Sequence, residues 1–388
     1  IRFEPRRDGG GRKKMRATHL DEAVFDDLAE QSGENLISVF VPTHRAGREV
    51  AQDRIYLKNQ LSSADDILSG LGWKPRERSE RLSQARELLD DVDFWEHQYA
   101  GLAVYIDSAG DVTTISSSRH LDASAVVMPV FLLRPLVADI QPTSAPVLAL
   151  TIDEVALFTA TETTVERMDV ELPSYDDVNW FVDRETQRQQ HPDRAASGRN
   201  RHGHEASTRT DEDFARFLRE VDAAIKGFES KTPLVVLGDD DLVARFSHHS
   251  GWETVSPENS GIGAPFSENR VHEMVAGTIA AMSQTRVEAA IADATDQLGV
   301  GMGTVDLDEA LAAAISGRVG RLVIHRNADP VWGRLDESTL EVDVQDVQRP
   351  GDVDLLDRLV VWSRSKGAEI VSSENEIDDR AFIATLRY

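Results

Sequence analysis

Cysteine is absent from the 388-residue sequence. This absence excludes disulfide bonds, thiolate zinc sites, iron–sulfur clusters and cysteine nucleophiles, and with them several classes of enzyme. The sequence also lacks an apolar run of the roughly 18 residues that a membrane span requires. Its most apolar stretch, residues 124–140, is interrupted by Pro129, Arg134 and Pro135. Because a secretory hydrophobic segment is lacking as well, we expect a cytoplasmic protein with no membrane partner.

Positive charge is scarce. The sequence has 42 Lys and Arg residues against 68 Asp and Glu residues, which gives a formal net charge of -26. Repulsion between such a protein and phosphate excludes a general nucleic-acid binder, and we expect no DNA partner. Any contact with RNA must be confined to a local cluster of Arg and Lys. The same acidity is typical of a highly soluble or salt-adapted protein, so it does not by itself indicate a partner.

Residues 1–14 form a basic, glycine-rich leader that is predicted to be disordered. Met15 directly precedes the first helical pattern, which favours an upstream translation artefact or an expression remnant. A basic RNA-binding arm is the alternative, because the leader carries six Arg and Lys residues, namely Arg2, Arg6, Arg7, Arg12, Lys13 and Lys14.

The chain is longer than one hydrophobic core usually organises, so two or three domains are expected. An N-terminal α/β domain is predicted for residues 15–142, where an amphipathic helix at 20–32 precedes a β-branched strand at 36–41. The Pro- and Ser-containing stretch 141–146 marks its end. The other elements predicted for this domain are helices at 55–70 and 77–91 and a hairpin of residues 101–107 and 112–116.

A central domain is predicted for residues 143–257. Three short strands joined by tight turns predict an antiparallel meander over residues 147–170. A polar segment, residues 183–209, then precedes a helix with one apolar face. The elements after the polar segment are a helix at 211–228, a strand at 234–237 and a helix at 240–248.

A third domain is predicted for residues 258–388. It opens with a long helix at 267–298, after which helices and strands alternate as in an α/β/α layer. The later elements are helices at 307–316 and 353–366 and strands at 321–325, 368–372 and 382–388. The predicted fold class is therefore α/β, in a multidomain chain.

The polar segment of the central domain concentrates positive charge in a chain that is acidic overall. Guanidinium groups can bind phosphate bidentately, and a flexible segment can fold on binding, so RNA contact is predicted here. A merely solvated loop is the alternative. The predicted RNA-binding residues are Arg188, Arg194, Arg199, Arg201, His202 and His204.

The same segment has a spacing of histidines that resembles a metal site, in His202, His204 and His191. We expect no metal there, because cationic neighbours oppose a divalent ion and carboxylates that would orient the histidines are lacking.

A second polar cluster follows the first predicted strand, at the edge where α/β proteins often place their sites. It comprises Thr43, His44, Arg45 and Arg48. The alternative interpretation is a hydrogen-bonded loop that packs the following helix.

Motifs for nucleotide cofactors and for serine hydrolases are missing. The sequence has no P-loop, no Gly-x-Gly-x-x-Gly after a strand and no Gly-x-Ser-x-Gly elbow. Asp239, Asp240 and Asp241 follow a strand and could hold Mg²⁺, but capping of the next helix is favoured. His248 and His249 end that helix, where cationic side chains complement its dipole. We therefore expect no cofactor and no metal.

The order of these elements resembles a known family. Strands, a polar loop, a long helix and a strand, followed by an α/β domain that ends in Leu386-Arg387-Tyr388, resemble the central and C-terminal domains of archaeal and eukaryotic class-one peptide release factors. Residues 355–370 look like the family's helix–Gly–strand step, and residues 306–311 with 322–324 resemble its helix and following strand. Residues 37–45 are similar to the N-terminal domain of the bacterial relatives of these factors.

The resemblance implies an RNase H-like central domain, a C-terminal domain like that of kink-turn-binding ribosomal proteins, and a ribosomal partner contacted through rRNA or tRNA. A translational GTPase is a further candidate partner. The family's chemical group is a Gly-Gly-Gln loop that positions water against the peptidyl-tRNA ester. This sequence has no Gly-Gly-Gln, and Gln189 and Gln190 of the polar segment are its catalytic candidates.

The leading hypothesis is a release-factor-like protein that binds the ribosome near the A site without hydrolysis, in ribosome rescue, quality control or hibernation. An unconventional peptidyl-tRNA hydrolase that uses Gln189 or Gln190 is one alternative. An acidic protein–protein adaptor without ribosome binding is another. Whether the protein is an enzyme stays open at this point.

Overall fold

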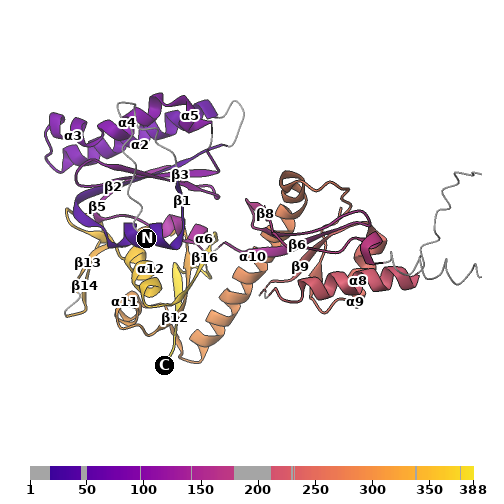
Figure 1. Cartoon of the computed structure of the whole chain (residues 1–388). Helices are drawn as coiled ribbons and strands as arrows, with labels where there is room; N and C mark the ends of the chain where they lie inside the picture. The colour runs from indigo at the N-terminus through magenta and orange to yellow at the C-terminus, as the bar shows by residue number, and fades with distance from the viewer. Residues whose placement is uncertain are drawn as a thin grey trace, which may run out of the picture. The chain divides into compact units, whose positions relative to one another are not determined.

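The computed structural model describes residues 18–44, 50–96, 98–140, 142–178, 211–228, 230, 232–336, 339–375 and 377–388. The chain divides into two compact units. Unit 1 comprises Ile1–Gln141 and Val287–Tyr388, and unit 2 comprises Pro142–Arg286. Each unit contains both helices and β-sheet, which confirms a mixed α/β, multidomain chain (Figure 1). The domain boundaries predicted at 142/143 and 257/258 remain predictions, and the leader lies outside the described residues.

The first sheet of unit 1 has five strands in the order β1-β4-β3-β2-β5. Strand β2 (Ser32–Pro42) pairs antiparallel with β3 (Gly101–Ile106), which forms the predicted hairpin with β4 (Val112–Ser117). The edges are β1 (Thr18–His19), which runs parallel to β4, and β5 (Ser124–Val130).

From Leu36 onward strand β2 is buried on both faces, which explains why this part of its sequence is nearly continuous in apolar residues. Ile37, Val39 and Val41 belong to one hydrophobic cluster, whereas Leu36 and Phe40 belong to another. Because side chains alternate along a strand, a single strand supplies both clusters. Helix α1 (Glu22–Glu30) contributes to the second cluster.

Helix α2 (Val50–Gly70) and a set of short helices supply the first cluster. The single helix predicted at 77–91 is wrong: the chain forms α3 (Pro75–Arg81), α4 (Ser83–Glu87) and the 3₁₀ turn η1 (Leu88–Asp90), followed by α5 (Val92–Trp95). Leu82 leaves helical geometry, with φ −92° and ψ 0°, and its side chain is fully buried. Burial of this side chain against the sheet accompanies the break.

The second sheet of unit 1 has the order β11-β17-β12-β16. Strands β12 (Val319–His325) and β16 (Glu369–Ser373) are parallel, and helix α12 (Leu355–Ser365) lies between them in the sequence. Gly367 follows this helix with φ +76°, the conformation expected of a glycine that ends a helix. The remaining elements are β11 (Gly303–Thr304), α11 (Leu307–Ile315) and β17 (Phe382–Leu386).

A small third sheet in unit 1 was not predicted. It has the order β14-β13-β15, with β13 (Trp332–Asp336), β14 (Glu341–Gln345) and β15 (Val353–Asp354). Helix α12 begins two residues later than predicted, because Val353 and Asp354 pair with β13 and Asp354 caps the helix through the N–H of Leu356.

A buried arginine joins the N-terminal and C-terminal parts of unit 1. Arg134, in the 3₁₀ turn η2 (Arg134–Leu136), has a side chain that is 5% exposed. Its guanidinium donates to the carbonyls of Arg326 and Ala328, each at 2.9 Å, and to the carboxylate of Asp354 at 3.0 Å. A fourth donation goes to the carbonyl of His325 at 3.2 Å. Together these hydrogen bonds of the planar guanidinium group connect the turn to the end of β12, to the segment after it and to the start of α12.

A buried carboxylate completes this connection. Asp357 of α12 is fully buried and accepts from the backbone N–H groups of Leu133 and Arg134 at 2.6 and 2.7 Å. The same carboxylate accepts from Arg358 at 2.5 Å. Leu133 and Arg134 are more than 220 positions from Asp357 in the sequence, so their contacts hold the first and last parts of the chain in one unit.

Unit 2 contains one sheet with the order β10-β9-β6-β7-β8. The predicted antiparallel meander is confirmed as β6 (Ala145–Leu150), β7 (Val155–Ala160) and β8 (Val165–Arg167). Strands β9 (Leu234–Gly238) and β10 (Thr254–Val255) extend it in parallel.

The sheet of unit 2 is covered on both faces. Helices α8 (Asp211–Ile225) and α9 (Asp240–His249) pack on one face, and helix α10 (Glu268–Gly299) packs on the other (Figure 1). The side chain of Asp239 accepts from the N–H of Asp241, so this carboxylate caps α9 as predicted. His248 and His249 lie in its last turn.

Helix α10 contributes to two hydrophobic cores along its length. Val271, Val275 and Ile279 are buried against the sheet of unit 2. Ala290 and Ala294 belong to a cluster of unit 1 that includes residues of β12 and β16.

None of the helices that the structure describes is both long and apolar enough to cross a membrane.

Candidate functional site

The loop after β2 carries the described part of the second polar cluster. Thr43 and His44 directly follow Pro42, the last residue of the strand. The hydroxyl of Thr43 donates to the carbonyl of Tyr99 at 2.8 Å, and its backbone N–H donates to the carbonyl of Ala100 at 3.1 Å. Both bonds fix the loop to the start of β3. Arg45 and Arg48 lie outside the described residues.

A buried carboxylate orients His44. Asp53, in the first turn of α2, is fully buried, whereas the side chain of His44 is 38% exposed. One oxygen of Asp53 lies 2.7 Å from Nδ1 of His44, and the other accepts from the backbone N–H of His44 at 2.9 Å. Holding the Nδ1 side of the ring against a carboxylate directs Nε2 away from it and fixes the ring's orientation.

This His–Asp pair can act in two ways. An imidazole oriented by a carboxylate can move a proton or donate to a phosphate. The same bonds also attach the loop to the first turn of α2, where a carboxylate is stabilised by the helix dipole. Sequence reasoning named His44 and missed Asp53, although an acidic residue in the first turn of the following helix was the signal that could have found it.

We expect Asp53→Asn to lower the free energy of unfolding by about 1–3 kcal/mol, because it disrupts a buried carboxylate that accepts two hydrogen bonds. His44→Ala should cost less, since the ring is partly exposed. Urea denaturation measures both. Asp66→Asn, an exposed change on the same helix, should leave stability unchanged. Equal stability of Asp53→Asn and the native protein would refute the fixing role of Asp53.

The arginine-rich candidates lie elsewhere in the chain. Arg188, Arg194, Arg199, Arg201, His202, His204 and the candidates Gln189 and Gln190 all lie outside the described residues, in the stretch from 179 to 210. The elements on both sides of this stretch, β8 and α8, belong to unit 2.

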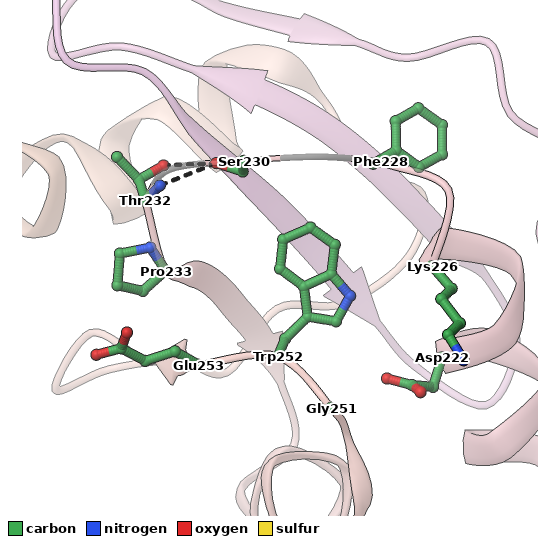
Figure 2. A pocket seen from close by; sticks show the side chains of 9 residues that line it. All are labelled: Asp222, Lys226, Phe228, Ser230, Thr232, Pro233, Gly251, Trp252 and Glu253. Atoms are coloured by element: carbon green, nitrogen blue, oxygen red, sulfur yellow. Dashed lines mark hydrogen bonds between the residues drawn. The ribbon is translucent and has the colours of Figure 1, made fainter.

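Unit 2 also has an open pocket of about 790 Å³ at the C-terminal end of α8. Figure 2 shows Trp252 in the middle of the pocket, with Thr232 and Pro233 on one side and Lys226 and Phe228 on the other. Asp222 accepts from the hydroxyl of Ser250 at 2.5 Å, and Trp252 and Phe228 pack partly against the core. An aromatic surface beside a lysine can stack against a planar group.

Sequence reasoning named none of the residues of this pocket. A tryptophan that follows Gly251 in a polar turn, outside the apolar pattern of any element, was the available signal.

Among the described residues, no group of three or more His, Asp or Glu side chains is arranged to hold a metal ion.

A comparison with protein families gives a match that begins in β6 and continues through the polar segment, α8, α9 and α10 to the end of α11. Residues 146–318 match the model of bacterial archaeo-eukaryotic release factor family 3. This match confirms the resemblance to the bacterial relatives of the class-one release factors. The matched segment includes all of the arginine-rich candidates and the Trp252 pocket, and it excludes the His44–Asp53 pair. No curated protein sequence matches the chain.

Solved structures of release-factor-like proteins are similar to the chain. Ribosome-bound archaeal Pelota is 14% identical over 74% of this chain and 77% of that chain, with a TM-score of 0.35. Dom34 of S. cerevisiae, a translation termination-like factor that interacts with Hbs1, is 8% identical over 74% and 80%, with a TM-score of 0.35. The archaeal termination factor aRF1 is 15% identical over 94% and 96%, with a TM-score of 0.23.

Proposed function

We propose that this protein is a release-factor-like factor that binds the ribosome near the A site, in ribosome rescue, quality control or hibernation. The observation that carries the proposal is the match of residues 146–318 to a release-factor family. In this proposal unit 2 has an RNase H-like fold, and the C-terminal part of unit 1 resembles kink-turn-binding ribosomal proteins. A translational GTPase is the protein partner.

The arginine-rich segment supplies the contact with rRNA or tRNA. Arg188, Arg194, Arg199 and Arg201 bind phosphate, and His202 and His204 add hydrogen bonds. An acidic chain can bind RNA only where its cations are concentrated, and the matched family segment includes this concentration. Co-sedimentation with ribosomes at low and high salt tests the proposal. Salt-sensitive association supports it, and lack of association at any salt favours the acidic adaptor.

Binding occurs without hydrolysis of the peptidyl-tRNA ester. The sequence has no Gly-Gly-Gln, and that chemistry needs two glycines for close approach of the backbone and a glutamine that orders water.

We expect the protein to release no peptide from stalled ribosomes above the spontaneous rate, and the Gln189→Ala/Gln190→Ala variant to behave identically. A single-turnover release assay measures this, with a release factor that contains Gly-Gly-Gln as the positive control. Release by the native protein that disappears in the double variant would establish the hydrolase alternative instead.

A further inference from the structure

Two arginines of unit 1 converge on one carboxylate oxygen. Oε1 of Glu374 lies 3.2 Å from Nη2 of Arg326 and 3.5 Å from Nη1 of Arg119. Arg326 directly follows β12, and Glu374 directly follows β16. Since β12 and β16 are adjacent parallel strands, both residues lie at the carboxyl end of the sheet, where open α/β sheets bind their ligands.

The side chain of Arg326 is buried, and some of its N–H donors make no hydrogen bond among the described residues. Its side chain is only 5% exposed, yet its Nε and Nη1 have no hydrogen-bond partner among the described residues. A guanidinium group has five N–H donors, and each buried donor left unsatisfied is costly. Burial lowers the pKa of Arg326, while the nearby Glu374 carboxylate raises it. A structural ion pair with Glu374 alone therefore leaves much of this group unsatisfied.

Of these three side chains, the carboxylate of Glu374 is the one that is most easily displaced. Its side chain is 61% exposed, and a single oxygen of it serves both arginines. An exposed carboxylate can turn into solvent at little cost, because water solvates it there. The oxygen that it places between Arg119 and Arg326 occupies the position where an oxygen of an oxyanion could bind.

We propose that Arg119 and Arg326 form a binding site for the phosphate group of a small molecule, and that Glu374 occupies the site in the absence of this ligand. Phosphate offers several acceptor oxygens, so it can take up the buried donors of Arg326 that one carboxylate oxygen leaves unused. The nearby carboxylates of Asp139 and Asp122 raise the pKa of Arg326, and they oppose a polyanion such as an RNA strand. A single small anion fits these surroundings better.

This site does not depend on the proposed function, because Arg119, Arg326 and Glu374 all lie outside the matched segment 146–318. Binding of inorganic phosphate to the full-length protein, measured by calorimetry at constant ionic strength, tests it. Glu374→Gln removes the competing charge, so we expect phosphate to bind about tenfold more tightly than to the native protein. Arg326→Gln should weaken binding at least about tenfold, and Arg326→Lys, which keeps the charge with fewer donors, should also weaken it.

The chain contains a matched control pair. Arg270 and Glu273 of α10 form an exposed ion pair with the same 3.2 Å separation, and Arg270→Gln and Glu273→Gln should leave phosphate binding unchanged. Tighter binding of AMP than of phosphate supports a phosphorylated metabolite as the ligand, and equal binding supports phosphate itself. Lack of phosphate binding to the native protein and to Glu374→Gln overturns the proposal. So does acetate that binds as tightly as phosphate, or an affinity that is the same in Glu374→Gln and the native protein.

Discussion

Replacing Arg188, Arg194, Arg199 and Arg201 with Gln is expected to weaken association with ribosomes by roughly 100-fold and to flatten its salt dependence. Each phosphate contact that is lost removes about 0.7–0.9 units from the slope of log affinity against log salt, so four lost contacts reduce the slope by roughly three to four. Co-sedimentation or fluorescence anisotropy over a series of salt concentrations measures both quantities. The effect is large because these four arginines lie close together in a chain whose formal net charge is -26.

The control for this experiment changes the net charge equally at other positions. Four exposed arginines of described helices, replaced together with Gln, should leave the affinity and the slope nearly unchanged; they are Arg76, Arg219, Arg270 and Arg286. Equal losses in both variants would mean that total charge, and not the arginine-rich segment, governs association. That result would remove the basis for placing the RNA contact in this segment.

Replacing Arg134 with Met is expected to lower the free energy of unfolding by about 3–5 kcal/mol near pH 7. The variant removes the positive charge that pairs with the buried Asp354, which keeps only backbone N–H donors, and it removes the donor to the carbonyls of Arg326 and Ala328. Chemical denaturation followed by tryptophan fluorescence measures the loss. The exposed change Arg76→Met should leave stability unchanged.

The loss should shrink in acid, and the direction follows from the pKa of Asp354. Burial raises this pKa, and Arg134 opposes the rise. A carboxyl group with a raised pKa in the folded state favours folding in its protonated form, at low pH, and this contribution is lost as pH increases through that pKa. Without Arg134 the pKa rises further, so the variant should recover stability relative to the native protein as the pH falls.

A double variant tests whether the loss of stability in Arg134→Met comes from the unpaired charge of Asp354. Arg134→Met with Asp354→Asn should be more stable than Arg134→Met alone near pH 7, because no buried charge remains unpaired. It should also lose the pH dependence of the single variant. A loss for Arg134→Met that is the same at all pH values would contradict the assigned role of Asp354.

Elements with a clear local signal in the sequence were predicted well. Helices α8 and α10 follow from apolar residues three and four positions apart, strand β2 from a run of β-branched and other apolar residues, and the meander of β6, β7 and β8 from short strands joined by tight turns. The small sheet of β13, β14 and β15 was missed, although Glu341-Val342-Asp343-Val344 alternates as a strand should. Its partner strand contains Gly333, which has no side chain to show a pattern, and Gly333 is required there because a Cβ would lie 2.5 Å from a backbone oxygen of Asp343.

Contacts between distant parts of the chain could not be predicted. The bonds from Leu133 and Arg134 to Asp357 join residues separated by more than 220 positions, and no local pattern records such a pairing. The break at Leu82 has the same origin, since tertiary burial overrides the local helical pattern there. Of the candidate sites, His44 could be named from its place after a strand, whereas its partner Asp53 depends on where α2 begins.

The interruption of unit 1 by unit 2 has a consequence for synthesis on the ribosome. Residues 142–286 emerge as one continuous stretch, so unit 2 can begin to fold while its chain is still growing. Unit 1 cannot complete its core until the C-terminal part of the chain has been synthesised, because the core around Phe40 and Tyr105 includes Leu355 and Leu359 of α12. Until that helix has been made, this apolar face of the first sheet is only partly covered, and this nascent stage is when we expect the protein to depend most on chaperones.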